Sequence, residues 1–307
     1  MGATGLQGGA VVTALLAAGH EASLIRAITR DPTGPKATAL ADKGIQVVQG
    51  DADDEASMAK AFENAYGAFL VTNFWADMNM SHEIAQTKTL ENAVIAASVT
   101  HVVLSTLEDT RPVINAAADK ESWKVLEEAS GSYVPHFDGK GAASKEFFAS
   151  AAPTTLLHTS FYYDNFINYG MGPKKHAEDQ PAAITFPTGD GAIPMCSVPD
   201  IGRRVVSILK DPETINTVQG VIGASHTGQE MADLFGKVLG TPVVFNTVET
   251  AAYANFGFPG AADLANMFRF WVSFKPVHRD VATTQKCLGG KLDTLEEWIE
   301  ANKAAFQ

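Results

Sequence analysis

The chain has 307 residues, 46% of them hydrophobic, which is enough to bury a large core in one or two domains. Its formal net charge of −12 argues against direct nucleic-acid binding, which needs clustered positive charge. No segment approaches the roughly 18 apolar residues of a membrane-spanning helix or the pattern of a secretory signal, so we expect no membrane association and a cytoplasmic protein, with the nucleus as a second compartment.

Hydrophobic periodicity divides the first half of the chain into alternating helices and strands. Helices are predicted at 7–18, 34–43, 55–65 and 81–97. Short apolar runs predict strands at 22–29, 44–48, 68–72 and 101–105. Apolar strands that alternate with helices are typical of a parallel sheet covered on both faces. We therefore expect an α/β fold with a doubly wound, parallel-sheet Rossmann domain.

The second half of the chain is less regular. Helices are predicted at 116–129, 139–151, 200–209 and 227–239, and a strand at 154–160. Thr294 and Glu297 predict a capping box at the start of a C-terminal amphipathic helix. Frequent glycine and proline beyond residue 165 indicate loops and a second lobe. We expect a nucleotide-binding domain at 1–155 and a smaller α/β lobe at 156–307, partly interleaved with it, for a substrate or partner.

A glycine-rich loop opens the chain, in the sequence MGATGLQGGAV. Such a loop before a helix lets a pyrophosphate approach backbone N–H groups at the helix N-terminus. Only Met1 precedes it, whereas a buried strand normally does. We expect the first strand to be missing or truncated because the natural chain starts a few residues earlier; the alternative is that another segment fills the gap. The cofactor-binding residues assigned to this loop are Gly2, Thr4, Gly5, Leu6, Gln7 and Gly8.

Arg30, at the end of the strand predicted at 22–29, bears on the choice of dinucleotide. An acid at this place accepts hydrogen bonds from the ribose 2′-hydroxyl of NAD, whereas an arginine suits the 2′-phosphate of NADP. Lys36 can assist Arg30, while the neighbouring Asp31 keeps NAD(H) open. We expect NADP(H) to be the preferred cofactor and NAD(H) to be the alternative.

Polar residues follow the other strands of the first half. Ligands of such sheets lie beyond the carboxyl ends of the strands, so these residues are expected to line the same crevice. Asp53 is assigned to capping the helix at 55–65. The cofactor-binding residues predicted at the strand ends are Asp51, Ala52, Thr72, Asn73, Phe74 and Ser105.

Metal chemistry has no support in the sequence. The two cysteines form no motif, and the eight histidines lack the spacing of a zinc site. We therefore predict no metal site.

Several stretches resemble the NmrA-like family, atypical members of the short-chain dehydrogenase/reductase superfamily. They are GATGLQGGAV, ITRDP, QGDADD, FLVTNFW, VVLSTLED, VPHFDGKG, FYYDNF and FGFPGAADLANMF, and they cover nearly the whole chain. The resemblance implies a Rossmann domain, a smaller C-terminal domain and NAD(P) binding. It also implies one of two roles, because the family includes redox-responsive regulators of other proteins and its relatives include NADPH-dependent reductases.

The catalytic pair of the superfamily, Tyr-x-x-x-Lys, is altered in this chain to His136 and Lys140. The resemblance implies that Lys140 holds the nicotinamide ribose. A histidine can act as a general acid near neutral pH, or His136 can pack beside the cofactor and leave Lys140 as the only acid. Tyr133 and Tyr163 are further candidate donors. Tyr162, a third such tyrosine, and Asn165 are expected to bind at the nicotinamide end.

Two functions follow from these features. The first is an NADP(H)-binding redox sensor, which has lost the catalytic tyrosine and contacts a regulatory protein. Its candidate cofactor-ordered segment is 108–134. The alternative is an NADPH-dependent oxidoreductase that reduces a small carbonyl or aromatic compound with Lys140, His136 or both. The expected partners are thus the dinucleotide and either a regulatory protein or a small-molecule substrate.

Overall fold

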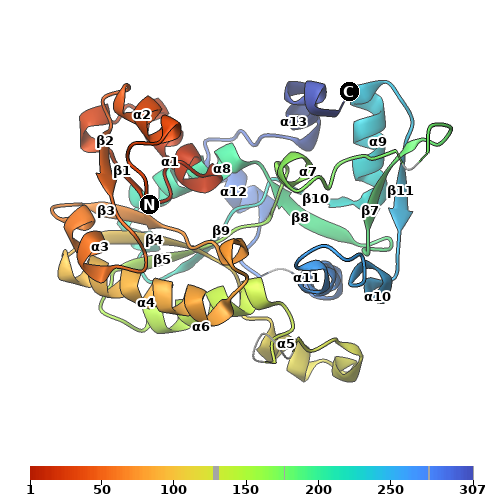
Figure 1. The fold of residues 1–307 in the computed structure, drawn as a ribbon, viewed down its shortest axis with the longest axis horizontal. Coiled ribbons are helices and arrows are strands. Elements are labelled where there is room, and N and C mark those ends of the chain that lie inside the picture. The colour runs from red at the N-terminus through yellow and green to blue at the C-terminus, as the bar shows by residue number, and fades with distance from the viewer. Residues whose placement is uncertain (127–130, 176, 276, 307) are drawn as a thin grey trace. The chain divides into compact units, whose positions relative to one another are not determined.

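The computed structural model describes residues 1–126, 131–175, 177–275 and 277–306, and the chain forms two units (Figure 1). The first unit comprises Met1–Asp109, His136–Thr159 and Val198–Val221. The second comprises Thr110–Pro135, Ser160–Ser197 and Ile222–Gln307. The chain therefore passes back and forth between the units.

The strands of the first unit are parallel, as the sequence predicts. They are β1 (Arg26–Thr29), β2 (Gln46–Gln49), β3 (Gly67–Leu70), β4 (His101–Thr106), β5 (Thr154–His158) and β9 (Val218–Gly220). β1 pairs with β2, and β3, β4, β5 and β9 pair in that order. This α/β architecture confirms the predicted fold class.

The sheet of the first unit is interrupted between β1 and β3. The segment Met1–Ala3 lies there: the amino group of Met1 donates to Phe69 O at 2.6 Å, and Ala3 N–H donates to Ile28 O at 3.4 Å. Figure 1 places the N-terminus between these two strands. Within the described residues, no strand pairs with β1 or β3 across this gap. The predicted gap in the sheet is therefore present.

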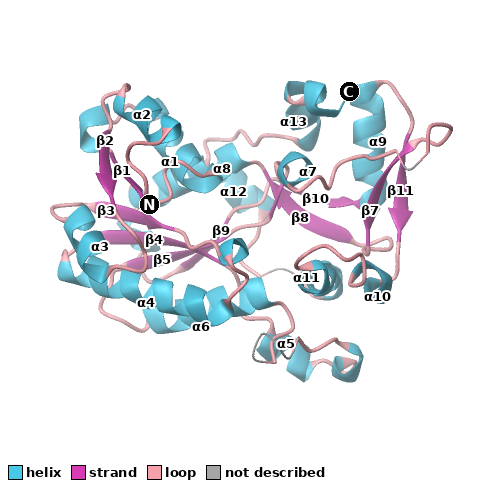
Figure 2. Cartoon of the chain, viewed as in Figure 1, coloured by secondary structure: helices cyan, strands magenta, loops and turns pink. Residues whose placement is uncertain are grey.

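Helices cover both faces of this interrupted sheet (Figure 2). They are α1 (Leu6–Ala17), α2 (Pro35–Ala41), α3 (Glu55–Phe62), α4 (Met80–Ala96), α6 (Pro135–Phe148) and α8 (Val198–Leu209). The buried side chains of α3, α4 and α6 pack on one face of β3 and β4. On the other face α1 contacts α8 so closely that a Cβ on Gly202 would lie 2.4 Å from Ala10 O. This packing fixes α1, the helix that follows the glycine loop.

The described residues of the second unit form two small sheets. Its strands are β6 (Phe161–Tyr162), β7 (Ala182–Phe186), β8 (Ala192–Cys196), β10 (Ala224–Thr227) and β11 (Val243–Thr247). β8 pairs with β6 in parallel and with β10 antiparallel, while β7 pairs with β11 in parallel. Its helices are α5 (Arg111–Ala116), α7 (Asn165–Asn168), α9 (Gly228–Leu239), α10 (Thr250–Tyr253), α11 (Ala261–Ser273), α12 (Val281–Cys287) and α13 (Leu295–Ala301).

Aromatic rings form much of the core of the second unit. The ring centroids of Phe186 and Phe268 lie 4.8 Å apart, and those of Phe166 and Phe235 lie 5.0 Å apart. The predicted capping box of α13 is confirmed, because Thr294 Oγ1 accepts from Glu297 N–H and the Glu297 carboxylate accepts from Thr294 N–H. None of the described helices is long and apolar enough to cross a bilayer.

The helix predicted at 116–129 is wrong over its described part. α5 ends at Ala116, and a short 3-10 turn follows at Lys120–Ser122. Trp123 is extended, and its ring stacks on Phe274 and lies 4.1 Å below the guanidinium of Arg269. These contacts with distant residues outweigh the local helix preference. Residues 127–130 of this prediction lie outside the described residues.

Candidate functional site

The glycine loop leaves the N-terminus of α1 open. Gly2 has a φ of +63°, which favours glycine, and its carbonyl accepts from Gly5 N–H at 2.9 Å. A Cβ on Gly8 would lie only 2.2 Å from Gly2 O, so a larger residue does not fit there. Gly5 precedes α1 and supplies no side-chain cap. The backbone N–H groups of the first turn therefore fit an anionic group such as a pyrophosphate.

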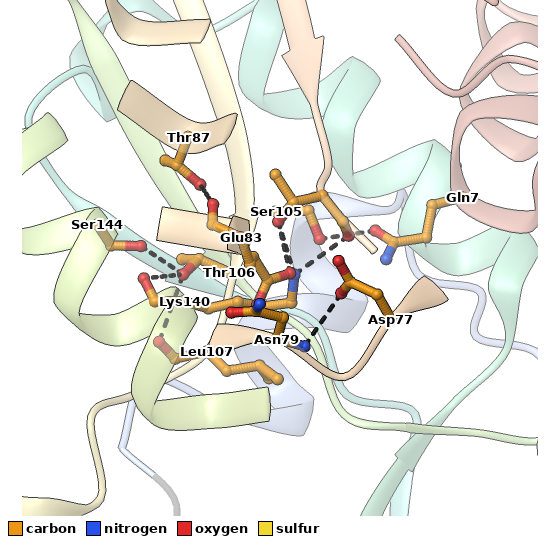
Figure 3. Close-up of polar contacts among 11 residues, drawn as sticks. Gln7, Asp77, Asn79, Glu83, Thr87, Ser105, Thr106, Leu107, Lys140 and Ser144 are labelled. Carbon is orange, nitrogen blue, oxygen red and sulfur yellow. Dashed lines mark hydrogen bonds and ion pairs between the residues drawn. The ribbon is translucent and has the colours of Figure 1, made fainter. Parts of the chain in front are cut away.

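The other residues of the loop differ in exposure. Thr4 is half-buried and Leu6 is exposed, whereas Gln7 turns toward the sheet. The hydroxyl of Ser105 donates to Gln7 Oε1 at 2.7 Å (Figure 3). This bond joins the start of α1 to the carboxyl end of β4, as expected if both segments line one crevice.

The charged residues after β1 differ in whether their side chains are already hydrogen-bonded. The Asp31 carboxylate accepts from the backbone N–H of Thr33 at 2.8 Å and from its hydroxyl at 2.7 Å, and these bonds hold the pKa of Asp31 below its usual value. Arg30 and Lys36 are exposed. The carboxylate of Asp31 is thus engaged by its own turn, while both cations remain accessible to solvent.

Asp53 does not cap the helix that follows it, contrary to the prediction. Asp54 immediately precedes α3 and accepts from Ser57 N–H, so the cap position falls one residue later. The Asp53 carboxylate instead contacts His82 Nε2 at 2.7 Å. His82 Nδ1 in turn contacts Asp77 Oδ2 at 2.5 Å. The hydrogen bond with Asp77, and after it the one with Asp53, raises the pKa of His82 above its usual value.

The remaining predicted residues at the strand ends lie in different environments. Asp51 is half-buried and its Oδ1 accepts from Asp53 N–H, while Ala52 is buried. Asn73 is exposed, whereas Phe74 is buried. Asp51 and Asn73 are therefore the more accessible members of this group.

Lys140 is the centre of a compact polar cluster (Figure 3). Its ammonium donates to Thr72 Oγ1 at 2.8 Å, to Thr72 O at 3.1 Å and to Glu83 Oε1 at 2.5 Å. The Thr72 hydroxyl itself donates to Glu83 Oε1 at 2.8 Å. The Lys140 side chain is 15% exposed and that of Glu83 is 2% exposed. The cluster thus holds a cation at the end of β3 with part of its side chain accessible.

Glu83 was not singled out from the sequence. It lies in the first turn of α4, on the buried stripe formed by Met80, Thr87 and Leu90 at spacings of three and four residues. An acid among the core positions of an amphipathic helix must have a polar partner, because burial of an unpaired charge is unfavourable. This pattern was the signal that could have identified it.

Contacts along α6 fix the position of Lys140. The Thr106 hydroxyl donates to Lys140 O at 3.2 Å and is bonded to the Ser144 hydroxyl. A Cβ on Gly141 would lie 2.3 Å from Asp109 N, so glycine allows α6 to approach the loop that follows β4. These contacts hold α6 at Lys140 and over the turn that follows it.

His136 is buried among aromatic rings, with 6% of its surface exposed. Its ring centroid lies 4.8 Å from that of Trp75, 4.7 Å from that of Phe137 and 6.1 Å from that of Phe74. His136 therefore packs against aromatic rings that include Phe74, and its expected place beside the cofactor remains a prediction.

The three candidate tyrosine donors belong to the second unit. The Tyr133 hydroxyl donates to Asn115 Oδ1 at 2.8 Å. Tyr163 is fully buried and packs beside Trp298, whereas Tyr162 is half-buried. Asn165 is also half-buried, at the start of α7. The expected contacts of Tyr162 and Asn165 with a dinucleotide remain predictions.

Comparison with known proteins adds an independent line of argument. The model of the NmrA-like family matches residues 1–299. The NmrA-like family domain-containing oxidoreductase notA' of Aspergillus versicolor is 30% identical over 361 residues, covering 99% of this chain and 96% of that protein. Quinone oxidoreductase 2 of Escherichia coli is 26% identical over 306 residues, covering 97% of this chain and 96% of that protein.

Solved structures share the fold. The NADPH-dependent quinone oxidoreductase QOR2 of Escherichia coli, complexed with NADPH, has a TM-score of 0.75 at 23% identity and covers 98% of both chains. NmrA, a negative transcriptional regulator, in complex with NADP has a TM-score of 0.77 at 19% identity, covering 97% of this chain and 92% of that one. A reductase and a regulator therefore share this architecture.

Proposed function

This chain belongs to the NmrA-like family, and from that premise we propose that it is an NADP(H)-dependent reductase of small carbonyl or aromatic compounds. The observation that carries the proposal is the ammonium of Lys140, held by Thr72 and Glu83 at the carboxyl end of β3. Nucleotide binding alone needs no buried carboxylate at this position. The names of the two curated relatives also favour an oxidoreductase over the sensor that the sequence favoured first.

The residues of the first unit suit NADP(H). The open N-terminus of α1 would hold the pyrophosphate, and Lys140 with Thr72 would hold the nicotinamide ribose. Arg30 and Lys36 would bind the 2′-phosphate, since the neighbouring Asp31 is engaged by Thr33. When bound, the reduced nicotinamide supplies the hydride for the reaction.

Lys140 is the better candidate for the proton donor. In the reduction of a carbonyl, the carbon accepts the hydride and the oxygen accepts a proton from Lys140 Nζ, which yields an alcohol and leaves a neutral amine. The side chain of Lys140 is partly exposed, whereas the ring of His136 is packed against those of Trp75 and Phe137. We therefore assign His136 to packing beside the site.

Hydride transfer from NADPH tests this proposal. The substrates are uncharged quinones and aromatic aldehydes, and the signal is the loss of nicotinamide absorbance. Lys140→Met should lower kcat by about 10²–10⁴-fold, the usual contribution of a general acid. Lys145→Met is the matched control because Lys145 is exposed on the same helix. Equal loss of activity in both variants would exclude Lys140 as the donor.

A redox sensor is the second candidate, and the burial of His136 in place of the usual tyrosine favours it. Its predicted cofactor-ordered segment, 108–134, is bonded to α11 over its described part: Asn266 donates to Lys124 O and Tyr133 O, and Arg269 donates to Ser122 O, each at 2.8 Å. NADPH-dependent protection of this segment from protease, together with no turnover of any substrate, would support the sensor instead.

A further inference from the structure

Glu83 is a buried acid outside the pair His136 and Lys140. Its Oε1 accepts two hydrogen bonds, one from Lys140 Nζ at 2.5 Å and one from the Thr72 hydroxyl at 2.8 Å. Its Oε2 has no hydrogen-bond partner among the residues that the structure describes. A Cβ on Gly139, the residue before Lys140, would lie 3.5 Å from this oxygen. One half of the carboxylate is therefore strongly bonded and the other faces the backbone of α6.

Stability alone explains this arrangement poorly. A buried ion pair gains little over apolar residues of the same size, because both charges lose their hydration. An unbonded carboxylate oxygen makes the balance worse. By contrast, Glu91 on the same helix is also buried, but it pairs with Lys88 at 2.6 Å near the surface. Glu83 is thus the acid of α4 whose placement suggests a role in the site.

Three hydrogen bonds form a closed triangle that restrains the ammonium. Lys140 donates to the Thr72 hydroxyl and to Glu83, and the Thr72 hydroxyl donates to Glu83. Because Thr72 follows β3 and Glu83 lies in α4, the triangle links α6 to two other elements of the first unit. It also places a full negative charge against the positive charge of Lys140.

We propose that Glu83 is the positioning residue of Lys140 and its permanent counter-charge, so that the site accepts uncharged carbonyl compounds and disfavours carboxylates near the reacting carbon. A cation already paired with a carboxylate has little attraction left for an anionic substrate. This inference deepens the reductase proposed above and rests on it for the substrate class. The pairing of Glu83 with Lys140 can be tested without turnover.

The first experiment is a double-mutant cycle on thermal stability, using Glu83→Gln, Lys140→Met and the double variant. Lys140→Met leaves a buried carboxylate without its counter-charge, so its Tm should fall. Adding Glu83→Gln to Lys140→Met should recover much of that fall, because the unpaired charge is removed. Glu91→Gln, the matched control, should not recover it. A further fall in the Tm of the double variant would overturn the pairing.

The second experiment applies the same cycle to kcat and to substrate choice. In the native chain, Glu83→Gln should lower kcat for benzaldehyde about tenfold or more. In a chain that already carries Lys140→Met, the same substitution should not lower kcat further. Glu83→Gln should also raise kcat/KM for 2-formylbenzoate relative to benzaldehyde, because the positive charge of Lys140 is then no longer neutralised and attracts the carboxylate of that substrate. Equal effects in both backgrounds, or an unchanged ratio of the two substrates, would refute the role of Glu83. Absence of any turnover in the native chain would refute the reductase, while the stability cycle would still decide the pairing.

Discussion

Replacement of Gly8 by alanine is a severe test of the glycine loop. The added Cβ would lie 2.2 Å from Gly2 O, 2.5 Å from Gly2 C and 2.7 Å from Met1 O, all backbone atoms. Cβ atoms in proteins essentially never lie closer than 3.0 Å to other atoms, so the loop would have to move by about 0.8 Å to accept the methyl group. Such a shift lengthens hydrogen bonds from the first turn of α1 beyond their useful range.

The expected loss of affinity follows from those hydrogen bonds. Each bond to a charged group contributes about 1.5–3 kcal/mol, so loss of one weakens NADPH binding by about 10–150-fold. Gly9→Ala is the matched control, because its Cβ would meet Ala3 O at 3.4 Å, an ordinary contact. Calorimetric titration with NADPH gives both dissociation constants. Equal affinities for Gly8→Ala and Gly9→Ala would refute the reasoning.

Three further predictions concern other parts of the molecule. Arg30→Ala should weaken NADPH binding about tenfold or more and leave NADH binding unchanged, because only NADPH carries the 2′-phosphate; parallel titrations measure this, and equal losses would remove Arg30 from the phosphate site. Burial holds the pKa of His101 below its usual value, so the folded chain binds fewer protons than the unfolded chain and stability should fall as the pH drops below about 6.5. Urea denaturation at several pH values should show that the unfolding free energy of His101→Gln falls less steeply with decreasing pH than that of the native chain. The same slope for both chains would contradict this assignment. Thr294→Ala should lower the unfolding free energy by about 1 kcal/mol, since it removes the capping box of α13; unchanged denaturation would count against that contribution.

The first unit could be predicted well because its signals are local. Apolar runs such as 101–105 and the glycine loop depend on neighbouring residues, and both are close to their expected places. Ser105 and Gln7, which the sequence assigns to the same crevice, are joined by a hydrogen bond at the carboxyl end of β4, where ligands of such sheets bind.

Other features depend on residues far apart in the sequence. The stack of Trp123 on Phe274 replaces a helix that local propensity favoured. Asp53 pairs with His82, which lies 29 residues later in α4. A capping rule considers only the next few residues of the chain, so it could not predict this pair. Glu83 is bonded to Lys140 across 57 residues, so the buried stripe of α4 indicates an acid that needs a partner but does not identify Lys140 as that partner. The short strands of the second unit, such as β6 with two residues, carry too little periodicity to be predicted.

Single-turnover oxidation of NADPH by an uncharged aromatic aldehyde tests the central claim most directly. At saturating NADPH, the native chain should oxidise the cofactor in a substrate-dependent burst, and Lys140→Met should slow that step by about 100-fold or more. Lys145→Met should behave as the native chain does. Tight NADPH binding without oxidation by any aldehyde or quinone, or equal rates for Lys140→Met and the native chain, would contradict the account.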